Sequence, residues 1–173
     1  MADRGLTGIL LVGGASTRFG SPKALAEIDG VTLAALAWDR LAFCGQRIAV
    51  GKAGDGLDLP FPILDDGSDV RAPIAGVVAG LRAAVNDVSV VLPVDTPYVT
   101  TEALEALAAA CRDAAVPQSG PLPGAYRKSA LPALEAALAA RRLSLRGAVA
   151  GLDVAQVEVD PALLTNINTP DDL

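Results

Sequence analysis

Short apolar runs alternate along this chain with segments in which apolar residues recur every three or four positions. A short continuous apolar run is typical of a strand buried on both faces of a sheet, and the longer spacing is typical of a helix that packs on it. The pattern predicts strands at residues 6–12, 47–50, 61–64, 88–94, 125–128 and 154–159, and helices at residues 33–43, 74–85, 101–112 and 130–141. The run at 88–94 is the most hydrophobic and rich in β-branched residues, so we expect it to be a central strand.

The alternation of strands and helices predicts an α/β fold with a mainly parallel sheet between helices. Gly76 and Gly80 would let the helix at 74–85 pack closely. With 173 residues the chain has room for one domain of ordinary size but not two, so we expect a single domain over residues 1–173. Thr169 and Pro170 are typical of the start of a helix. Because the chain stops at Leu173, we expect that final helix to be truncated.

Composition favours a soluble cytoplasmic protein that does not bind membranes. Although 51% of the residues are hydrophobic, no apolar run approaches the roughly 18 residues of a membrane helix, and the N-terminus lacks the pattern of a secretory signal. Cys44 and Cys111 have no metal-ligand spacing around them, so we expect both to be small buried apolar residues.

Charge and the missing histidine narrow the chemistry. The net charge of −6 disfavours binding of nucleic acid by a broad basic face. The chain has no histidine, which excludes Ser-His catalysis and zinc bound by histidine. Any metal would be a hard ion held by carboxylates, which favours Mg²⁺.

The loop after the first predicted strand is the strongest functional signal. Residues 11–23 combine three glycines, several hydroxyl groups and the cations Arg18 and Lys23. Glycines let a backbone approach a ligand closely, and free N–H groups with two cations form a receptacle for phosphates. The glycine spacing fits neither a P-loop nor the dinucleotide-binding fingerprint. The alternative is an ordinary strand-to-helix turn with surface charges.

Asp95 directly follows the strand predicted at residues 88–94. If that strand lies beside the first one, Asp95 and the glycine-rich loop share the carboxyl edge of the sheet, where ligands of such folds bind. There Asp95 could hold a Mg²⁺ that bridges nucleotide phosphates, although a turn-forming role is the alternative.

Three further places carry weaker signals. Asn166 and Asn168 lie one residue apart, so in an extended segment both amides point the same way and could bind metal-held water or a substrate headgroup. Asp66 could accept hydrogen bonds from a base edge, or belong to a solvated acidic turn. Arg127 and Lys128 could contact an anionic acceptor.

The order of these motifs resembles that of molybdenum cofactor guanylyltransferases, which belong to the sugar-nucleotidyltransferase-like superfamily. The resemblance extends over essentially the whole chain. It rests on four segments: residues 11–23, Pro73-Ile74-Ala75-Gly76, Asp95-Thr96-Pro97, and the closing run Asn166-Ile167-Asn168-Thr169-Pro170-Asp171-Asp172-Leu173. The closing run is the part most similar to the guanylyltransferases.

The resemblance implies a Rossmann-like three-layer α/β/α sandwich that transfers GMP from GTP to molybdenum-bearing molybdopterin and releases pyrophosphate. It also implies roles for individual residues. The nucleotide would contact Leu11, Val12, Gly13, Gly14, Lys23, Asp66 and Asp95, and the acceptor would lie near Asn166 and Asn168. The expected catalytic groups are Lys23, Arg18 and a Mg²⁺ held by Asp95, which would neutralise charge during in-line phosphoryl attack.

Two departures from the family pattern bear on the base. Gly51 stands where family members often carry an asparagine, and Ser21-Pro22-Lys23 is closer to related molybdopterin cytidylyltransferases. The alternatives are therefore a cytidylyltransferase, a transferase for another small molecule, or a nucleotide-binding domain without catalytic activity. For the main hypothesis we expect a monomer whose partners are GTP and molybdopterin.

Overall fold

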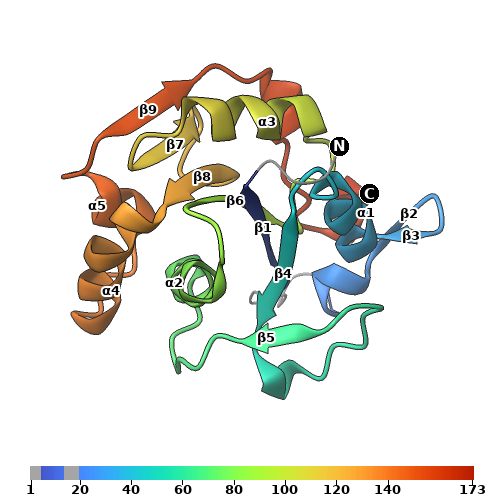
Figure 1. Cartoon of the computed structure of the whole chain (residues 1–173). Helices are drawn as coiled ribbons and strands as arrows, with labels where there is room; N and C mark the ends of the chain where they lie inside the picture. Colours follow the sequence, from blue (N-terminus) through green and yellow to red (C-terminus); the bar gives the residue numbers. More distant parts are fainter. Residues whose placement is uncertain (1–4, 14–19) are drawn as a thin grey trace.

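The computed structural model describes residues 5–13 and 20–173 and shows a central sheet with helices on both faces (Figure 1). The sheet has seven strands in the order β5-β4-β1-β6-β8-β7-β9. Its strands are β1 (Leu6–Leu11), β4 (Gln46–Gly51), β5 (Ile63–Asp65), β6 (Val88–Pro93), β7 (Ala114–Pro117), β8 (Gly124–Arg127) and β9 (Val154–Val157). A separate two-stranded hairpin pairs β2 (Glu27–Ile28) with β3 (Val31–Thr32).

Strand β1 lies inside the sheet, parallel to β4 on one side and to β6 on the other. Ile9 of β1 is opposite Ile48 of β4 and Val91 of β6, so the three strands end at the same edge. Strand β5 continues the parallel order beyond β4. After β1 the chain adds β4 and β5 on one side of it and then β6 on its other side. The strand order therefore reverses at β1, and ligands of α/β sheets bind at such a switch point. The predicted adjacency of the first strand and the strand at 88–94 is confirmed.

The helices form two layers that bury both faces of β1. The α-helices are α1 (Leu33–Arg40), α2 (Pro73–Ala83), α3 (Thr101–Ala110), α4 (Leu131–Ala139) and α5 (Leu145–Val149). Leu10 packs in the cluster under α1 and α3, whereas Ile9 and Leu11 pack in the cluster under α2, α4 and α5. Burial on both sides explains the unbroken apolar run from Ile9 to Val12. The predicted α/β/α sandwich is confirmed.

The remaining elements are short. The 3₁₀ turns are η1 (Lys23–Leu25), η2 (Ala53–Asp55), η3 (Lys128–Ala130), η4 (Pro161–Leu164) and η5 (Pro170–Asp172). The turn η5 begins as predicted from Thr169 and Pro170, with a capping box that Asp172 completes. None of the described helices has the length and apolarity needed to cross a bilayer.

The pattern did not predict β7, the β2–β3 hairpin or α5. Strand β7 begins Ala114-Ala115, residues that favour no strand on their own, and it is held by pairing with β8 and β9. Strand β8 runs antiparallel to both of its neighbours, which local periodicity does not encode. Cys44 and Cys111 are buried free thiols, as expected, and burial raises their pKa to about 12 and about 11.

Two glycines bring α2 close to β1, as their spacing predicts. A Cβ atom on Gly76 would lie 2.8 Å from Leu11 Cδ2. A Cβ atom on Gly80 would lie 2.7 Å from Ile9 Cγ2 and 2.8 Å from Ile9 Cδ1. Ile9 is fully buried and branched at Cβ, so it has little freedom to move away.

We predict that Gly80→Ala lowers the free energy of unfolding by about 1–2 kcal/mol, because overpacking against Ile9 outweighs the gain in helix propensity. Urea unfolding measures the change. Gly54→Ala is the matched control, since Gly54 is exposed and a Cβ atom there meets nothing within 4 Å. A stabilising Gly80→Ala would contradict the close contact.

Candidate functional site

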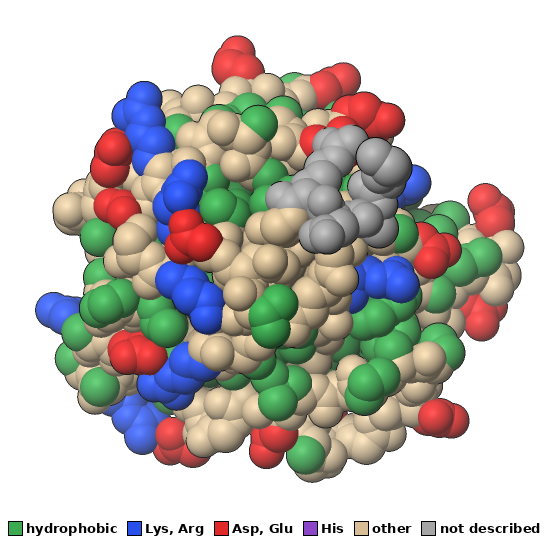
Figure 2. Space-filling view, in the orientation of Figure 1, with side chains coloured by type: hydrophobic (Ala, Val, Ile, Leu, Met, Phe, Trp, Pro, Cys, Tyr) green, Lys and Arg blue, Asp and Glu red, His purple; other side chains and the backbone are tan. Residues whose placement is uncertain are grey.

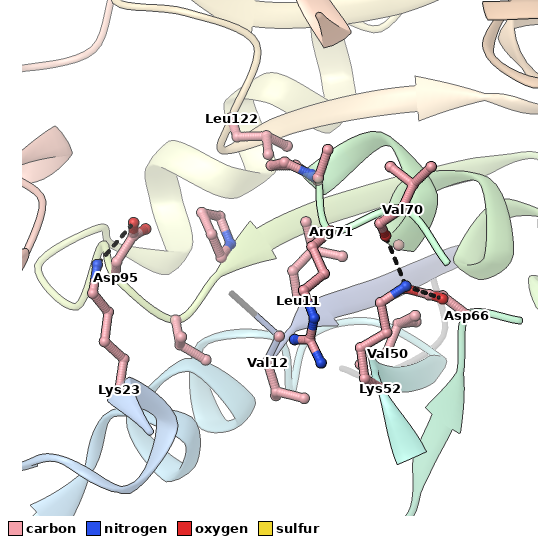
Figure 3. Close-up of a pocket in the computed structure, with 17 residues that line it drawn as sticks. Leu11, Val12, Lys23, Val50, Lys52, Asp66, Val70, Arg71, Asp95 and Leu122 are labelled. Carbon is pink, nitrogen blue, oxygen red and sulfur yellow. Dashed lines mark hydrogen bonds and ion pairs between the residues drawn. The ribbon is translucent and has the colours of Figure 1, made fainter. Parts of the chain in front are cut away.

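A cleft of about 310 Å³ opens at the edge where β1, β4 and β6 end (Figure 3). Its walls come from the ends of these strands, from the segment that leads into α2, and from single residues of η1 and of the loop before β8. The lining residues are Leu11, Val12, Gly13, Lys23, Val50, Gly51, Lys52, Asp66, Val70, Arg71, Ala72, Pro73, Gly76, Pro93, Val94, Asp95 and Leu122. Figure 3 shows one charged pair toward each end, with Leu11, Val12 and Arg71 between them.

One end of the cleft joins three segments that are distant in the sequence. Lys23 Nζ lies 3.9 Å from Asp95 Oδ2 and donates a hydrogen bond to Asn168 Oδ1 at 3.3 Å. The N–H of Ile167 donates to the carbonyl of Asp95 at 2.7 Å, and the Ile167 side chain is buried. The segment at 166–172 is therefore fixed to the loop after β6, with Asn168 directed at Lys23.

Burial raises the pKa of the Asp95 carboxyl, and the nearby Lys23 ammonium only partly opposes this. Its ionised form is consequently less stable than that of an aspartate in water, so a cation at the cleft would gain by binding to it. Among the described residues no three acidic, histidine or cysteine side chains are grouped to hold a metal. A site built on Asp95 fits Mg²⁺ with substrate phosphates and water as its other ligands, which is the usual arrangement for that ion.

The other end of the cleft holds a second ion pair. Lys52 Nζ lies 2.7 Å from Asp66 Oδ1, and the Asp66 side chain is only 7% exposed. The N–H of Asp66 donates to the carbonyl of Gly51 at 3.0 Å, which fixes Asp66 to the end of β4. This end therefore presents a carboxylate in a defined position, next to the apolar residues Val50 and Val70.

Arg71 adds a cation near the middle of the cleft (Figure 3). Its guanidinium donates to both carboxylate oxygens of Asp55, at 2.9 and 3.4 Å. Just beyond it, α2 begins with no side-chain cap on its N-terminus, and Gly76 of its first turn lines the cleft. The positive end of the helix dipole therefore points toward the cleft, which favours an anion there.

The structure brings most of the predicted site residues together. Those that line the cleft are Leu11, Val12, Gly13, Lys23, Asp66 and Asp95. Asn168 joins them through Lys23, whereas Asn166 is exposed and does not line the cleft. Gly14 and Arg18 lie outside the described residues. The individual roles of these residues stay predictions.

Sequence reasoning missed Lys52, Arg71 and Leu122. Lys52 directly follows β4, so the rule that ligands gather at the carboxyl ends of parallel strands could have found it. Arg71 lies two residues before α2, but nothing in the sequence distinguishes it from a surface arginine. Leu122 belongs to the loop before β8, and only the antiparallel return of that strand brings it to the cleft.

The structure does not place Arg127, which the sequence allowed as a contact for an anionic acceptor, among the residues that line the cleft. Arg127 is opposite Val88 at the start of β6, whereas Asp95 follows the end of that strand. Its guanidinium pairs with Asp87 at 2.7 Å and also donates to the carbonyl of Cys111. Arg127 therefore stabilises the far edge of the sheet, and its neighbour Lys128 lies on that same edge. Figure 2 shows basic and acidic side chains interspersed over the visible face.

The fold is similar to that of solved nucleotidyltransferases. The chain superimposes with a TM-score of 0.82 on molybdopterin-guanine dinucleotide biosynthesis protein A from Archaeoglobus fulgidus, at 26% identity over 96% of this chain and 94% of that one. It superimposes with a TM-score of 0.73 on 2-C-methyl-D-erythritol 4-phosphate cytidylyltransferase from Thermus thermophilus, at 20% identity over 95% and 94% of the two chains. The second likeness shows the fold alone.

Sequence comparison defines the family more closely. The profile of the MobA-like NTP transferase domain matches residues 8–156, and the chain belongs to this family. A probable molybdenum cofactor guanylyltransferase from Chloroflexus aggregans is 32% identical over 192 residues, which covers 97% of this chain and 91% of the relative. The family membership expected from the motif order is confirmed.

We predict that replacing two aspartates of this region by asparagine has opposite effects on the stability of the protein at neutral pH. The pKa of Asp95 is raised, so its ionised form costs stability, and Asp95→Asn should stabilise the protein at neutral pH. The pKa of Asp172 is lowered by backbone hydrogen bonds from Asn168 and Thr169, so Asp172→Asn should destabilise it there. The effect of Asp95→Asn should disappear as the pH falls through the raised pKa of Asp95 toward the ordinary carboxyl pKa of 3.8. The effect of Asp172→Asn should disappear only below that value, as the pH falls through the lowered pKa of Asp172. Urea unfolding at a series of pH values measures them, and a destabilising Asp95→Asn at neutral pH would contradict the assignment.

Proposed function

We propose that this protein transfers the GMP group of GTP to molybdenum-bearing molybdopterin and releases pyrophosphate. The observation that carries the proposal is the meeting of Lys23 and Asp95 at 3.9 Å, at one end of a cleft whose other end presents the carboxylate of Asp66. Membership of the MobA-like NTP transferase family and the name of the relative from Chloroflexus aggregans support the choice of substrates.

In the proposed reaction a phosphate oxygen of the acceptor attacks the α-phosphorus of GTP in line with the leaving group. The bond from the α-phosphorus to the bridging oxygen of the β-phosphate breaks, and pyrophosphate leaves with the electron pair. A phosphomonoester is already largely ionised near neutral pH, so the attacking oxygen needs no histidine as a base. Catalysis then depends on positioning and on neutralising charge.

The residues of the cleft divide these tasks. Leu11 and Val12, at the end of β1, would contact the nucleoside, and Asp66 would accept hydrogen bonds from the donors on the base. Lys23 would bind the phosphates, together with Arg18 from the glycine-rich loop. The spacing of the two charged pairs along the cleft supports this orientation of the nucleotide (Figure 3).

Asp95 is the residue that would hold Mg²⁺. When bound, the ion supplies positive charge that stabilises the phosphate oxygens during transfer. Asp95 contributes one carboxylate whose ionised form is poorly solvated, and Lys23 beside it places a second positive charge at the same end. Asn168 would orient Lys23 and face the acceptor, with Asn166 on the same segment.

A cytidylyltransferase acting on the same acceptor is the second candidate. It is favoured by one observation, the segment Ser21-Pro22-Lys23 directly before and at the start of η1. The Asp66 carboxylate argues for guanine, because guanine presents two adjacent N–H donors and cytosine presents one beside an acceptor nitrogen.

We predict that pyrophosphate release in the presence of molybdopterin and Mg²⁺ is fastest with GTP among GTP, CTP and ATP. Asp95→Asn should lower kcat on the order of 10²-fold or more, because it removes the carboxylate that balances the metal charge. Asp39→Asn on the exposed face of α1 is the control and should leave kcat unchanged. Preference for CTP would favour the cytidylyltransferase instead. Full activity of Asp95→Asn would contradict the role proposed for Asp95.

We also predict that Lys23→Ala weakens GTP binding about tenfold or more, since one charge-assisted contact to phosphate is lost. Its melting temperature should change little, because an ion pair at 3.9 Å and an exposed hydrogen bond at 3.3 Å each contribute little to stability. Lys128→Ala is the control for the change in total charge, because it removes an exposed lysine at the far edge of the sheet. Calorimetric titration with GTP measures the affinities, and equal affinity of Lys23→Ala and wild type would contradict a phosphate role.

A further inference from the structure

Lys52 is an unusual lysine because its side chain lines the end of the cleft that holds Asp66 and is only 14% exposed. Removing an ammonium group from water is costly unless every proton finds a partner. The three hydrogen bonds of Lys52 go to Asp66 Oδ1 at 2.7 Å, to the Val70 carbonyl at 2.7 Å and to the Ser68 carbonyl. An ammonium has three protons, so none is left over for a ligand.

These bonds fold residues 66–70 into a loop around the ammonium group. Within it, the N–H of Ser68 donates to Asp66 Oδ1 at 2.9 Å, and the N–H of Val70 donates to the Ser68 hydroxyl at 3.1 Å. Lys52 itself follows β4, so it anchors the loop to the sheet. The wall of the cleft at this end therefore has a shape that depends on one side chain.

The same bonds decide which oxygen of Asp66 can meet a ligand. Oδ1 accepts from both Lys52 and Ser68, whereas Oδ2 accepts from no residue in the described part of the chain. An ionised carboxylate only accepts hydrogen bonds. The remaining oxygen is therefore suited to a base edge that presents N–H donors, and unsuited to one with an acceptor nitrogen at that position.

We infer that Lys52 is a positioning residue for base selection: it fixes Asp66 so that Oδ2 accepts from the N–H donors of guanine and disfavours cytosine and adenine. The inference rests on the proposed function, because it assigns the selectivity of the same cleft. Lys52 acts through Asp66 and not on the nucleotide, since its protons are all used.

A second ion pair joins the chain after β4 to the segment before α2. Arg71 pairs with Asp55 of η2 at 2.9 Å, and the arginine side chain is 55% exposed. An exposed pair contributes little to stability and is screened by salt. The almost buried Lys52 pair is therefore the one that sets the position of Asp66.

The test measures kcat and KM for GTP and for CTP in wild type, Lys52→Met, Asp66→Asn and the double variant. We expect Lys52→Met to raise KM for GTP about tenfold or more and to lower the GTP/CTP ratio of kcat/KM by a similar factor, with kcat for GTP within about twofold. Lys128→Met, at the far edge of the sheet, is the matched control and should change neither value.

The double variant separates positioning from a general loss of structure. If Lys52 acts only through Asp66, the double variant should be no less selective than Asp66→Asn alone, so the two effects are not additive. Simple destabilisation would lower the folded fraction equally for both nucleotides and leave their ratio unchanged. An unchanged ratio in folded Lys52→Met, or additive effects, would overturn the inference.

Two further outcomes keep the result interpretable. If Lys52→Met does not fold, two other variants replace it: Lys52→Arg, which keeps the positive charge, and Asp66→Asn, which keeps Lys52. An unchanged preference for GTP in Asp66→Asn would overturn the inference by itself. Partial GTP preference in Lys52→Arg would support it. A wild type that turns over no nucleotide would instead refute the proposed function, which distinguishes the two failures.

Discussion

The parallel pairing of β1 with β4 and β6 is the constraint on which the site depends. Leu11 is opposite both Val50 and Pro93, and the pairing continues past the strands, from the Val12 N–H to the Val50 carbonyl and from the Val94 N–H to the Leu11 carbonyl. The segments that follow the three strands are thereby held at one edge. Strand β1 is paired on both sides up to its last residue, Leu11, so its backbone groups are satisfied until it enters the cleft.

The cleft is lined by charges that are already partly paired. Lys52 and Asp66 are nearly buried and closely bonded, so this pair is fixed before any ligand arrives. Lys23 and Asp95 are more exposed and 3.9 Å apart, which leaves both able to respond to phosphate and metal. A fixed end suits recognition of a base, and an adaptable end suits a group whose charge changes during reaction. The raised pKa of Asp95 means that its ionised form has a cost in stability.

The segment at 166–172 shows how local and tertiary information combine. Thr169, Pro170 and Asp172 form a capped turn whose signal is wholly local. The same residues carry no information on where the turn lies. Burial of Ile167 and its N–H bond to the Asp95 carbonyl decide that, and they place Asn168 beside a lysine that precedes it by 145 positions.

The sequence by itself determined the apolar strands, the main helices, the close packing at Gly76 and Gly80, and the family, because periodicity, caps and glycine spacing act within a few residues. It also indicated that Lys23 and Asp95 belong to one site. Only the tertiary structure decided the antiparallel direction of β8, the strand made by Ala114 and Ala115, and the removal of Arg127 to the far edge. It alone revealed Lys52 behind Asp66, because a buried ion pair depends on which chain segments exclude water, and no local pattern encodes that.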